Sequence, residues 1–195
     1  MYGHVILTDV DGVLLNWLES FDQWMARHNL FPLYGMGNEY SIERRFGLTK
    51  TEKNLYTRTF NESAAIAYLP PLRDAMHYVN LLHRKHGYVF HAITSLSLEP
   101  TAGLARTENI KRLFGETAFQ KFTYLDTGAD KHEALKEYQE SGCYWVEDKA
   151  ENCDVGIDLG LIGILMAHEY NADYKGDAIR VQNWKEIYEM ITKNG

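Results

Sequence analysis

Short apolar runs alternate with helical patterns along most of this chain, and this alternation limits the folds open to it. The runs are rich in Val, Ile, Phe and Tyr without strict polar alternation, which is typical of parallel strands covered on both faces. Five strands are expected at Val5–Thr8, Tyr88–Thr94, Phe122–Leu125, Tyr144–Val146 and Leu161–Met166, with Ala178–Val181 as a candidate edge strand. Helices between successive strands predict an α/β fold with a central parallel sheet and right-handed crossovers.

Helix ends can also be placed from the sequence. Glycines at positions 87 and 115 follow the last residue of an apolar helical stripe, where glycine commonly stops a helix. The last helix is expected to begin after Asn183, with Glu186 three residues further on as in a capping box.

One segment breaks the alternation. Residues 14–71 have helical periodicity but no convincing strand, and they begin directly after the first strand. The segment must therefore lie over the carboxyl end of the sheet, which is where ligands bind in open α/β sheets. We predict a small helical cap at 14–71 and a catalytic core made of 1–13 and 72–195. Arg44 and Arg45 of the cap are expected on a solvated face.

The first predicted strand ends in Asp9-Val10-Asp11-Gly12. Two carboxylates at this spacing can share one divalent cation and one substrate. They suit phosphoryl transfer in which one carboxylate attacks phosphorus and the other carries a proton. A solvated turn is the simpler alternative, because Asp and Gly are common turn residues. The aspartate pair is strong evidence for phosphoryl transfer only if the other groups that this chemistry needs follow later in the chain.

Three further groups do follow, in order. Thr94 and Ser95 end the second strand, where a hydroxyl and a backbone N–H can donate to a phosphate oxygen. Lys131 opens a predicted helix, where a cation is unfavourable because of the helix dipole. An anion lying opposite Lys131 would explain this placement. An acidic pair closing a later strand contains Asp148, which together with Asp9 could supply the oxygen ligands of Mg²⁺. Taken singly, each group has an ordinary explanation as a turn or surface residue.

In this order the motifs resemble those of the haloacid dehalogenase (HAD) superfamily of phosphohydrolases, and the resemblance extends over the whole chain. It implies a Rossmann-like core with a cap inserted after the first strand. It also implies that Asp9 is the nucleophile and Asp11 the general acid/base, while Thr94 and Lys131 hold the phosphate. Mg²⁺ would be bound by the Asp9 carboxylate, the Asp11 backbone carbonyl and Asp148.

Within the superfamily the chain is most similar to the 5'(3')-deoxyribonucleotidases. The similarity lies in Asp-x-Asp-Gly-Val-Leu followed by the aromatic Trp17, a helical cap ending in Leu69-Pro70-Pro71-Leu72, Thr94-Ser95, and the acidic pair before Lys149. It implies that Trp17 lies against a substrate base, and it adds Gly12 and Ser95 to the substrate-binding set. Packing within the cap core is the alternative role for Trp17.

Two residues depart from the nucleotidase pattern. Glu147 replaces the usual first aspartate of the late pair, and Asn16 replaces an acidic residue before the aromatic. Neither departure removes a residue of the catalytic set.

Charge and composition exclude several partners. The formal net charge of -7 argues against nucleic acid or an anionic membrane surface. No apolar run reaches the length of a membrane span, and no signal peptide is recognisable at the N-terminus. Cys143 and Cys153 are expected to be reduced thiols of a cytoplasmic protein. A homodimer is compatible with the sequence.

These observations lead to one principal hypothesis and several alternatives. The principal one is a Mg²⁺-dependent phosphomonoesterase that forms an aspartyl-phosphate and acts on a small ester, with a nucleoside monophosphate as the expected substrate. A phosphatase of sugar phosphates or other metabolites is the first alternative, and a catalytically silent binding protein on the same scaffold is another. A polynucleotide end phosphatase is disfavoured because the chain lacks a basic stripe.

Overall fold

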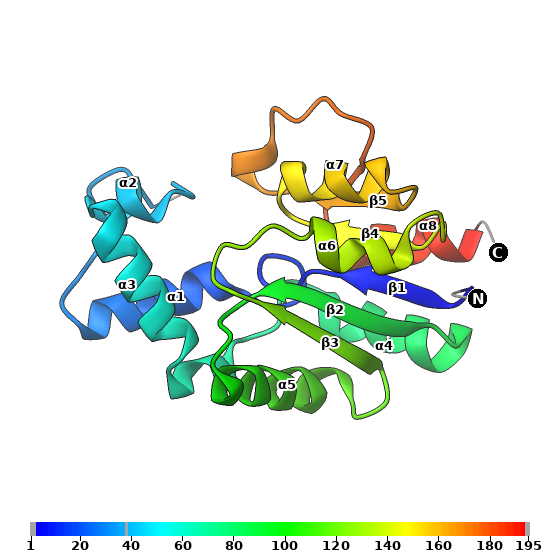
Figure 1. Ribbon diagram of the computed structural model, residues 1–195, viewed down its shortest axis with the longest axis horizontal. Helices are drawn as coiled ribbons and strands as arrows, with labels where there is room; N and C mark the ends of the chain where they lie inside the picture. The colour runs from blue at the N-terminus through cyan, green and yellow to red at the C-terminus, as the bar shows by residue number, and fades with distance from the viewer. Residues whose placement is uncertain (1–2, 38, 194–195) are drawn as a thin grey trace.

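The computed structural model describes residues 3–37 and 39–193 (Figure 1). Its centre is a sheet of six parallel strands in the order β3-β2-β1-β4-β5-β6. The strands are β1 (Val5–Thr8), β2 (Val89–Ser95), β3 (Phe119–Leu125), β4 (Tyr144–Glu147), β5 (Ile162–Met166) and β6 (Ile179–Val181). All the strands expected from the sequence are confirmed, including the edge strand. The third begins earlier than expected because Phe119 already pairs with Phe90 of β2.

Helices cover both faces of this sheet. One face carries α4 (Ala75–His86), α5 (Pro100–Phe114) and α8 (Trp184–Lys193), and the other carries α6 (His132–Leu135) and α7 (Ala150–Asp158). Two short 3₁₀ helices, η2 (Lys136–Tyr138) and η3 (Glu169–Asn171), follow α6 and β5. The larger core lies under the first group of helices, and a smaller core around Trp145 lies under the second. The predicted α/β architecture is therefore confirmed.

The helix ends follow the local signals in the sequence. Gly87 and Gly115 end α4 and α5, and both have positive φ angles, 71° and 96°, which suit glycine. The Glu186 backbone N–H donates to the Asn183 side chain at 3.1 Å, which confirms Asn183 as the cap of α8. No described helix has the length and apolarity needed to span a lipid bilayer.

Four helical segments lie between β1 and α4. They are α1 (Trp17–Arg27), α2 (Ile42–Phe46), α3 (Lys50–Asn61) and the 3₁₀ helix η1 (Ala64–Tyr68). Figure 1 shows α1, α2 and α3 projecting beyond one end of the sheet. Phe21 centres their packing, with ring contacts to Trp17, Trp24, Phe46 and Phe60. We refer to α1, α2, α3 and η1, together with the loops that join them, as the cap. The exact boundaries, 14 and 71, stay a prediction.

The solvated face expected for Arg44 and Arg45 is wrong for Arg45. Its side chain is buried and forms an ion pair with Asp22 of α1. It also donates to the backbone carbonyls of Met36 and Glu39, at 3.4 and 3.1 Å. The fork of guanidinium donors satisfies carbonyl groups in the loop before α2, so Arg45 holds the cap together.

Candidate active site

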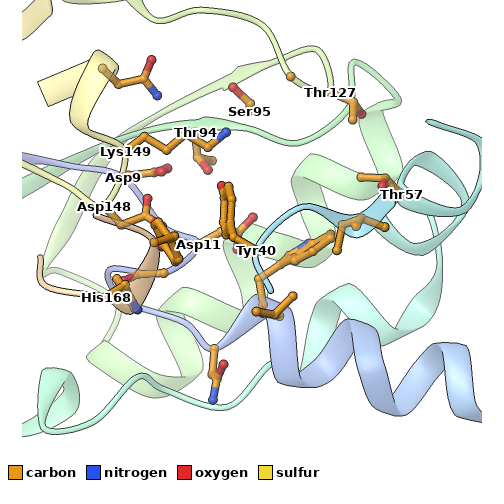
Figure 2. A pocket seen from close by; sticks show the side chains of 18 of the residues that line it. Asp9, Asp11, Tyr40, Thr57, Thr94, Ser95, Thr127, Asp148, Lys149 and His168 are labelled. Atoms are coloured by element: carbon orange, nitrogen blue, oxygen red, sulfur yellow. The ribbon is translucent and has the colours of Figure 1, made fainter. Parts of the chain in front are cut away.

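A cavity of about 620 Å³ lies between the sheet and the cap. It lies where the strand order reverses, since β1 is flanked by β2 on one side and β4 on the other. Ligands of doubly wound sheets bind at this switch point. The cavity is lined by every residue expected at the site: Asp9, Asp11, Gly12, Trp17, Thr94, Ser95, Lys131 and Asp148. Figure 2 shows Asp9, Thr94 and Asp148 at its core end and Thr57 of the cap at the far end.

Lys131 is the central cation of the core end. It immediately precedes α6, and its side chain is buried. Its Nζ lies 2.7 Å from Asp9 Oδ2 and 2.8 Å from Glu147 Oε2. A lysine at the start of a helix is unfavourable unless an anion lies nearby, and these two carboxylates are such anions. A solvated surface lysine is therefore excluded, and Lys131 faces the expected nucleophile.

Glu147, which departs from the nucleotidase pattern, has a clear structural position. One of its oxygens accepts from Lys131, and the other accepts backbone N–H groups of Asp148 and Lys149, each at 3.0 Å. Both oxygens of this fully buried carboxylate are thus committed within the protein. Glu147 orients Lys131 and fixes the turn that carries Asp148, which leaves Asp9 and Asp148 facing the cavity.

The carboxylates at this end suit a divalent cation. Asp9, Glu147 and Asp148 are buried, and each offers an oxygen within 4.8 Å of the others. Burial raises the pKa of all three carboxyls; Asp9 further raises the pKa of Asp148, whereas Lys131 lowers that of Asp9 and Glu147. Lys131 is shared between two of them, so a hard cation with oxygen ligands would offset charge that the protein leaves uncompensated. The donor set therefore fits Mg²⁺, with Asp9 and Asp148 as the carboxylates available to hold it.

Asp11 has a partner that the sequence did not indicate. Arg106 of α5 is fully buried, and its two terminal nitrogens donate to the two carboxylate oxygens of Asp11. Burial raises the pKa of the Asp11 carboxyl, and Arg106 opposes that rise. Arg106 Nε has no hydrogen-bond partner among the described residues, so the guanidinium is committed chiefly to Asp11. This ion pair sets the orientation of the expected acid/base.

Gly12 makes room for the neighbouring carboxylate. Its φ of 74° lies in the left-handed region, and a Cβ at this position would collide with the Asp148 carboxylate. The same Cβ would come within 3.3 Å of the Tyr170 hydroxyl. The glycine after the aspartate pair is thus required by the close approach of Asp148, whatever it contributes to substrate binding.

The hydroxyl residues at the end of β2 differ from each other. Thr94 is buried and borders the cavity. Ser95 also borders the cavity, but its hydroxyl donates to the Ala129 carbonyl at 2.8 Å. Ser95 therefore ties the end of β2 to the loop before Lys131, and Thr94 has the more direct position for a phosphate.

The cap side of the cavity includes the Trp17 ring and a row of polar side chains on α3. Trp17 stacks on Phe21 with centroids 4.8 Å apart, and its Nε1 donates to Asn61 Oδ1 at 2.9 Å. Lys53, Thr57 and Asn61 repeat every four residues along α3 and all border the cavity. Trp17 thus packs within the cap and also borders the cavity.

Several residues of the site escaped the sequence argument. Arg106 lies on the buried stripe of α5 with Ala102 and Ile110, so a charge at a core position was the available signal. Tyr40 and Tyr170 also border the cavity, and they carried no recognisable motif. Their positions depend on how a cap loop and the turn after β5 meet in space.

Comparisons with known proteins agree with this fold. No family model matches the chain. An uncharacterized 32.4 kDa protein of Enterobacteria phage T4 is 29% identical over 202 residues, covering 95% of this chain and 69% of the phage protein. A haloacid dehalogenase-like hydrolase from Streptococcus pneumoniae superposes with a TM-score of 0.66 at 14% identity, covering 96% and 98% of the two chains. The chain has the haloacid dehalogenase fold.

Two other structures with this fold carry ligands. CbbY from Rhodobacter sphaeroides in complex with phosphate has a TM-score of 0.61 at 18% identity, covering 94% of this chain and 96% of CbbY. The HAD-hydrolase YfnB from Bacillus subtilis, bound to magnesium, has a TM-score of 0.63 at 14% identity, covering 97% and 98%. At such identities the similarity establishes the fold, and the chemistry has to be argued from the site.

Proposed function

We propose that this protein is a Mg²⁺-dependent phosphomonoesterase that works through an aspartyl-phosphate. One observation carries the proposal. Asp9 lies at the wall of a cavity, its Oδ2 is 2.7 Å from Lys131 Nζ, and Asp148 belongs to the same cluster of carboxylates. A nucleophilic carboxylate must be presented to a phosphate dianion without repulsion, and a buried ammonium beside it meets that need.

The first half of the reaction uses Asp9 and Asp11. An Asp9 oxygen attacks phosphorus, the bond from phosphorus to the ester oxygen breaks, and Asp11 gives its proton to the leaving oxygen. Burial raises the pKa of Asp11 and so favours the protonated form that this step needs. Mg²⁺, when bound, would offset the charge of the phosphoryl oxygens.

The second half hydrolyses the aspartyl-phosphate. Asp11, now ionised, takes a proton from water, the water oxygen attacks phosphorus, and the Asp9 carboxylate is released with inorganic phosphate. The pair with Arg106 stabilises this ionised form of Asp11. Lys131 stays beside Asp9 through both halves and holds charge near the transferring group.

We further propose a nucleoside monophosphate as substrate. A cavity of about 620 Å³ is far larger than a phosphate requires, so it has room for a sizeable leaving group. The Trp17 indole borders it, and aromatic rings suit the flat face of a base. Lys53 is the cation that the cap adds to the lining, and it lies 3.8 Å from Glu43, so the cap end favours an uncharged leaving group over a second phosphate.

A substrate panel tests both levels of the proposal. Nucleoside 5'-monophosphates, ribose 5-phosphate and p-nitrophenyl phosphate are compared with Mg²⁺ and after its removal with a chelator. We expect turnover to require Mg²⁺ and nucleotides to be the best substrates. Full activity in excess chelator would show that the carboxylates do not hold a catalytic metal. Preference for ribose 5-phosphate would leave the phosphatase assignment standing and overturn the nucleotide assignment.

A further inference from the structure

The turn after β5 forms hydrogen bonds to Asp148, one of the three clustered carboxylates. The Tyr170 hydroxyl donates to Asp148 Oδ2, and Asn171 Nδ2 donates to the Asp148 backbone carbonyl at 2.8 Å. Asn171 also donates to the Met166 carbonyl at 2.7 Å, which anchors the turn to the end of β5. Asp148 is therefore fixed through both its side chain and its backbone.

A row of rings connects this turn to the aspartate loop and to the cap. The His168 and Tyr170 rings stack at 4.9 Å and 6°, and His168 Nε2 lies 2.7 Å from the Gly12 carbonyl. On the other side Tyr40, which lies in the cap segment before α2, approaches Tyr170 with a centroid distance of 4.0 Å. Figure 2 shows Tyr40 standing over the cavity close to Asp11 and Asp148. Tyr170 thus contacts a cap ring with its face and Asp148 with its hydroxyl.

We infer that Tyr170 is a positioning residue for the cation site and that Tyr40 links the cap to that site through it. The inference rests on the proposed Mg²⁺ site. Partners that hydrogen-bond to a metal ligand orient it, and removing one typically weakens metal binding by about 10- to 100-fold. Because Tyr40 packs on the ring that carries the hydroxyl, the cap in its observed position holds that hydroxyl on Asp148. Coupling between two sites is reciprocal, so bound Mg²⁺ would also stabilise the contact of the cap with Tyr170.

The chain offers a matched control for each residue. Tyr174 is a second tyrosine that donates to a carboxylate, Asp154, but neither residue borders the cavity. Tyr34 belongs to the same cap loop as Tyr40 and is fully exposed. Tyr174→Phe and Tyr34→Ala therefore reproduce the chemical changes of Tyr170→Phe and Tyr40→Ala away from the site.

The test measures the Kd of Mg²⁺ by isothermal titration calorimetry, without substrate. We expect Tyr170→Phe to raise the Kd at least tenfold while the melting temperature of the metal-free protein stays close to that of the wild type. Tyr40→Ala should raise the Kd about threefold, a smaller effect because it acts through packing. Neither control variant should change it. An unchanged Kd in Tyr170→Phe, or an equal change in Tyr174→Phe, overturns the positioning role.

A double variant tests the link between the cap and the site. If Tyr40 acts through the Tyr170 hydroxyl, Tyr40→Ala should add nothing to the Kd of Tyr170→Phe, so the two effects are not additive. Full additivity overturns the link. Phosphatase activity separates this inference from the proposed function. An active, Mg²⁺-requiring enzyme with unchanged Kd in Tyr170→Phe refutes the inference alone, whereas a wild type that binds no Mg²⁺ and hydrolyses no ester refutes both.

Discussion

The two ends of the cavity are built from different chemistry. At the core end, Lys131 joins Asp9 to Glu147 and Arg106 holds Asp11, so charged groups on separate elements fix one another within hydrogen-bond distance. At the cap end the lining includes an indole ring and neutral side chains, and Thr57 Oγ1 is buried without a hydrogen-bond partner among the described residues. The charged groups at the core end are thus paired with one another, whereas the cap end has a hydroxyl left free by the described residues to hydrogen-bond with a ligand.

Under the proposed function, this difference would separate catalysis from substrate selection. Preorganised charges stabilise a transition state because they are already in place, and the buried pairs at the core end suit that role. Recognition of a leaving group needs a surface of the right shape with a few polar groups, which the cap end would provide. Changes at the core end should therefore affect all esters alike, and changes at the cap end should affect them unequally.

The largest effect is expected at Asp9. Asp9→Asn keeps the volume of the side chain but removes the proposed nucleophile and a proposed metal ligand, so turnover of every ester should fall to background. Phosphate release by the purified variant measures this, with Asp158→Asn on the exposed end of α7 as control. Release above a trace of the wild-type rate would exclude the covalent mechanism.

Lys131→Met should lower kcat by about 10²- to 10³-fold, the cost of removing one preorganised donor at a reacting centre. It should also destabilise the fold, since Asp9 and Glu147 lose a shared buried partner. Steady-state kinetics and thermal melts measure the two effects. Lys136→Met removes a half-exposed lysine of the next turn and should change neither. A twofold change in kcat would remove Lys131 from the catalytic machinery.

Arg106→Met should lower kcat by about a hundredfold, because general acid/base catalysis depends on a correctly oriented carboxyl. Arg112→Met, on the same helix, removes a guanidinium that stacks on Tyr68 outside the cavity and serves as the control. The loss should be shared equally by nucleotides and p-nitrophenyl phosphate. A loss confined to nucleotides would place Arg106 in recognition and break the division between the two ends.

Trp17→Ala should have the smallest effect, and an unequal one. Stacking of a base on an aromatic ring contributes roughly 1–3 kcal/mol, so the ratio of kcat/KM for a nucleoside monophosphate to that for p-nitrophenyl phosphate should fall about ten- to a hundredfold. Trp24→Ala removes another ring that contacts Phe21 but does not border the cavity. Equal changes of the ratio in both variants would mean that Trp17 acts only by packing the cap.

The sequence alone determined the sheet and, at the core end, the positions of Asp9, Asp11, Lys131 and Asp148, but not that of Arg106. Apolar runs show strands, and the carboxyl ends of neighbouring parallel strands meet at one edge, so Asp9, Thr94 and Asp148 had to converge there. Short-range patterns were sufficient for these conclusions because each residue lies at the end of a recognisable strand or, for Lys131, at the start of a helix.

Only the tertiary structure decided which side chains pair across that edge. Arg106 meets Asp11 across 95 residues and Tyr170 meets Asp148 across 22, and no local pattern encodes either contact. Arg45 likewise turned inward because the cap loop folds around it. Such contacts depend on how whole helices and turns pack together, which brings buried polar groups face to face and obliges them to find partners.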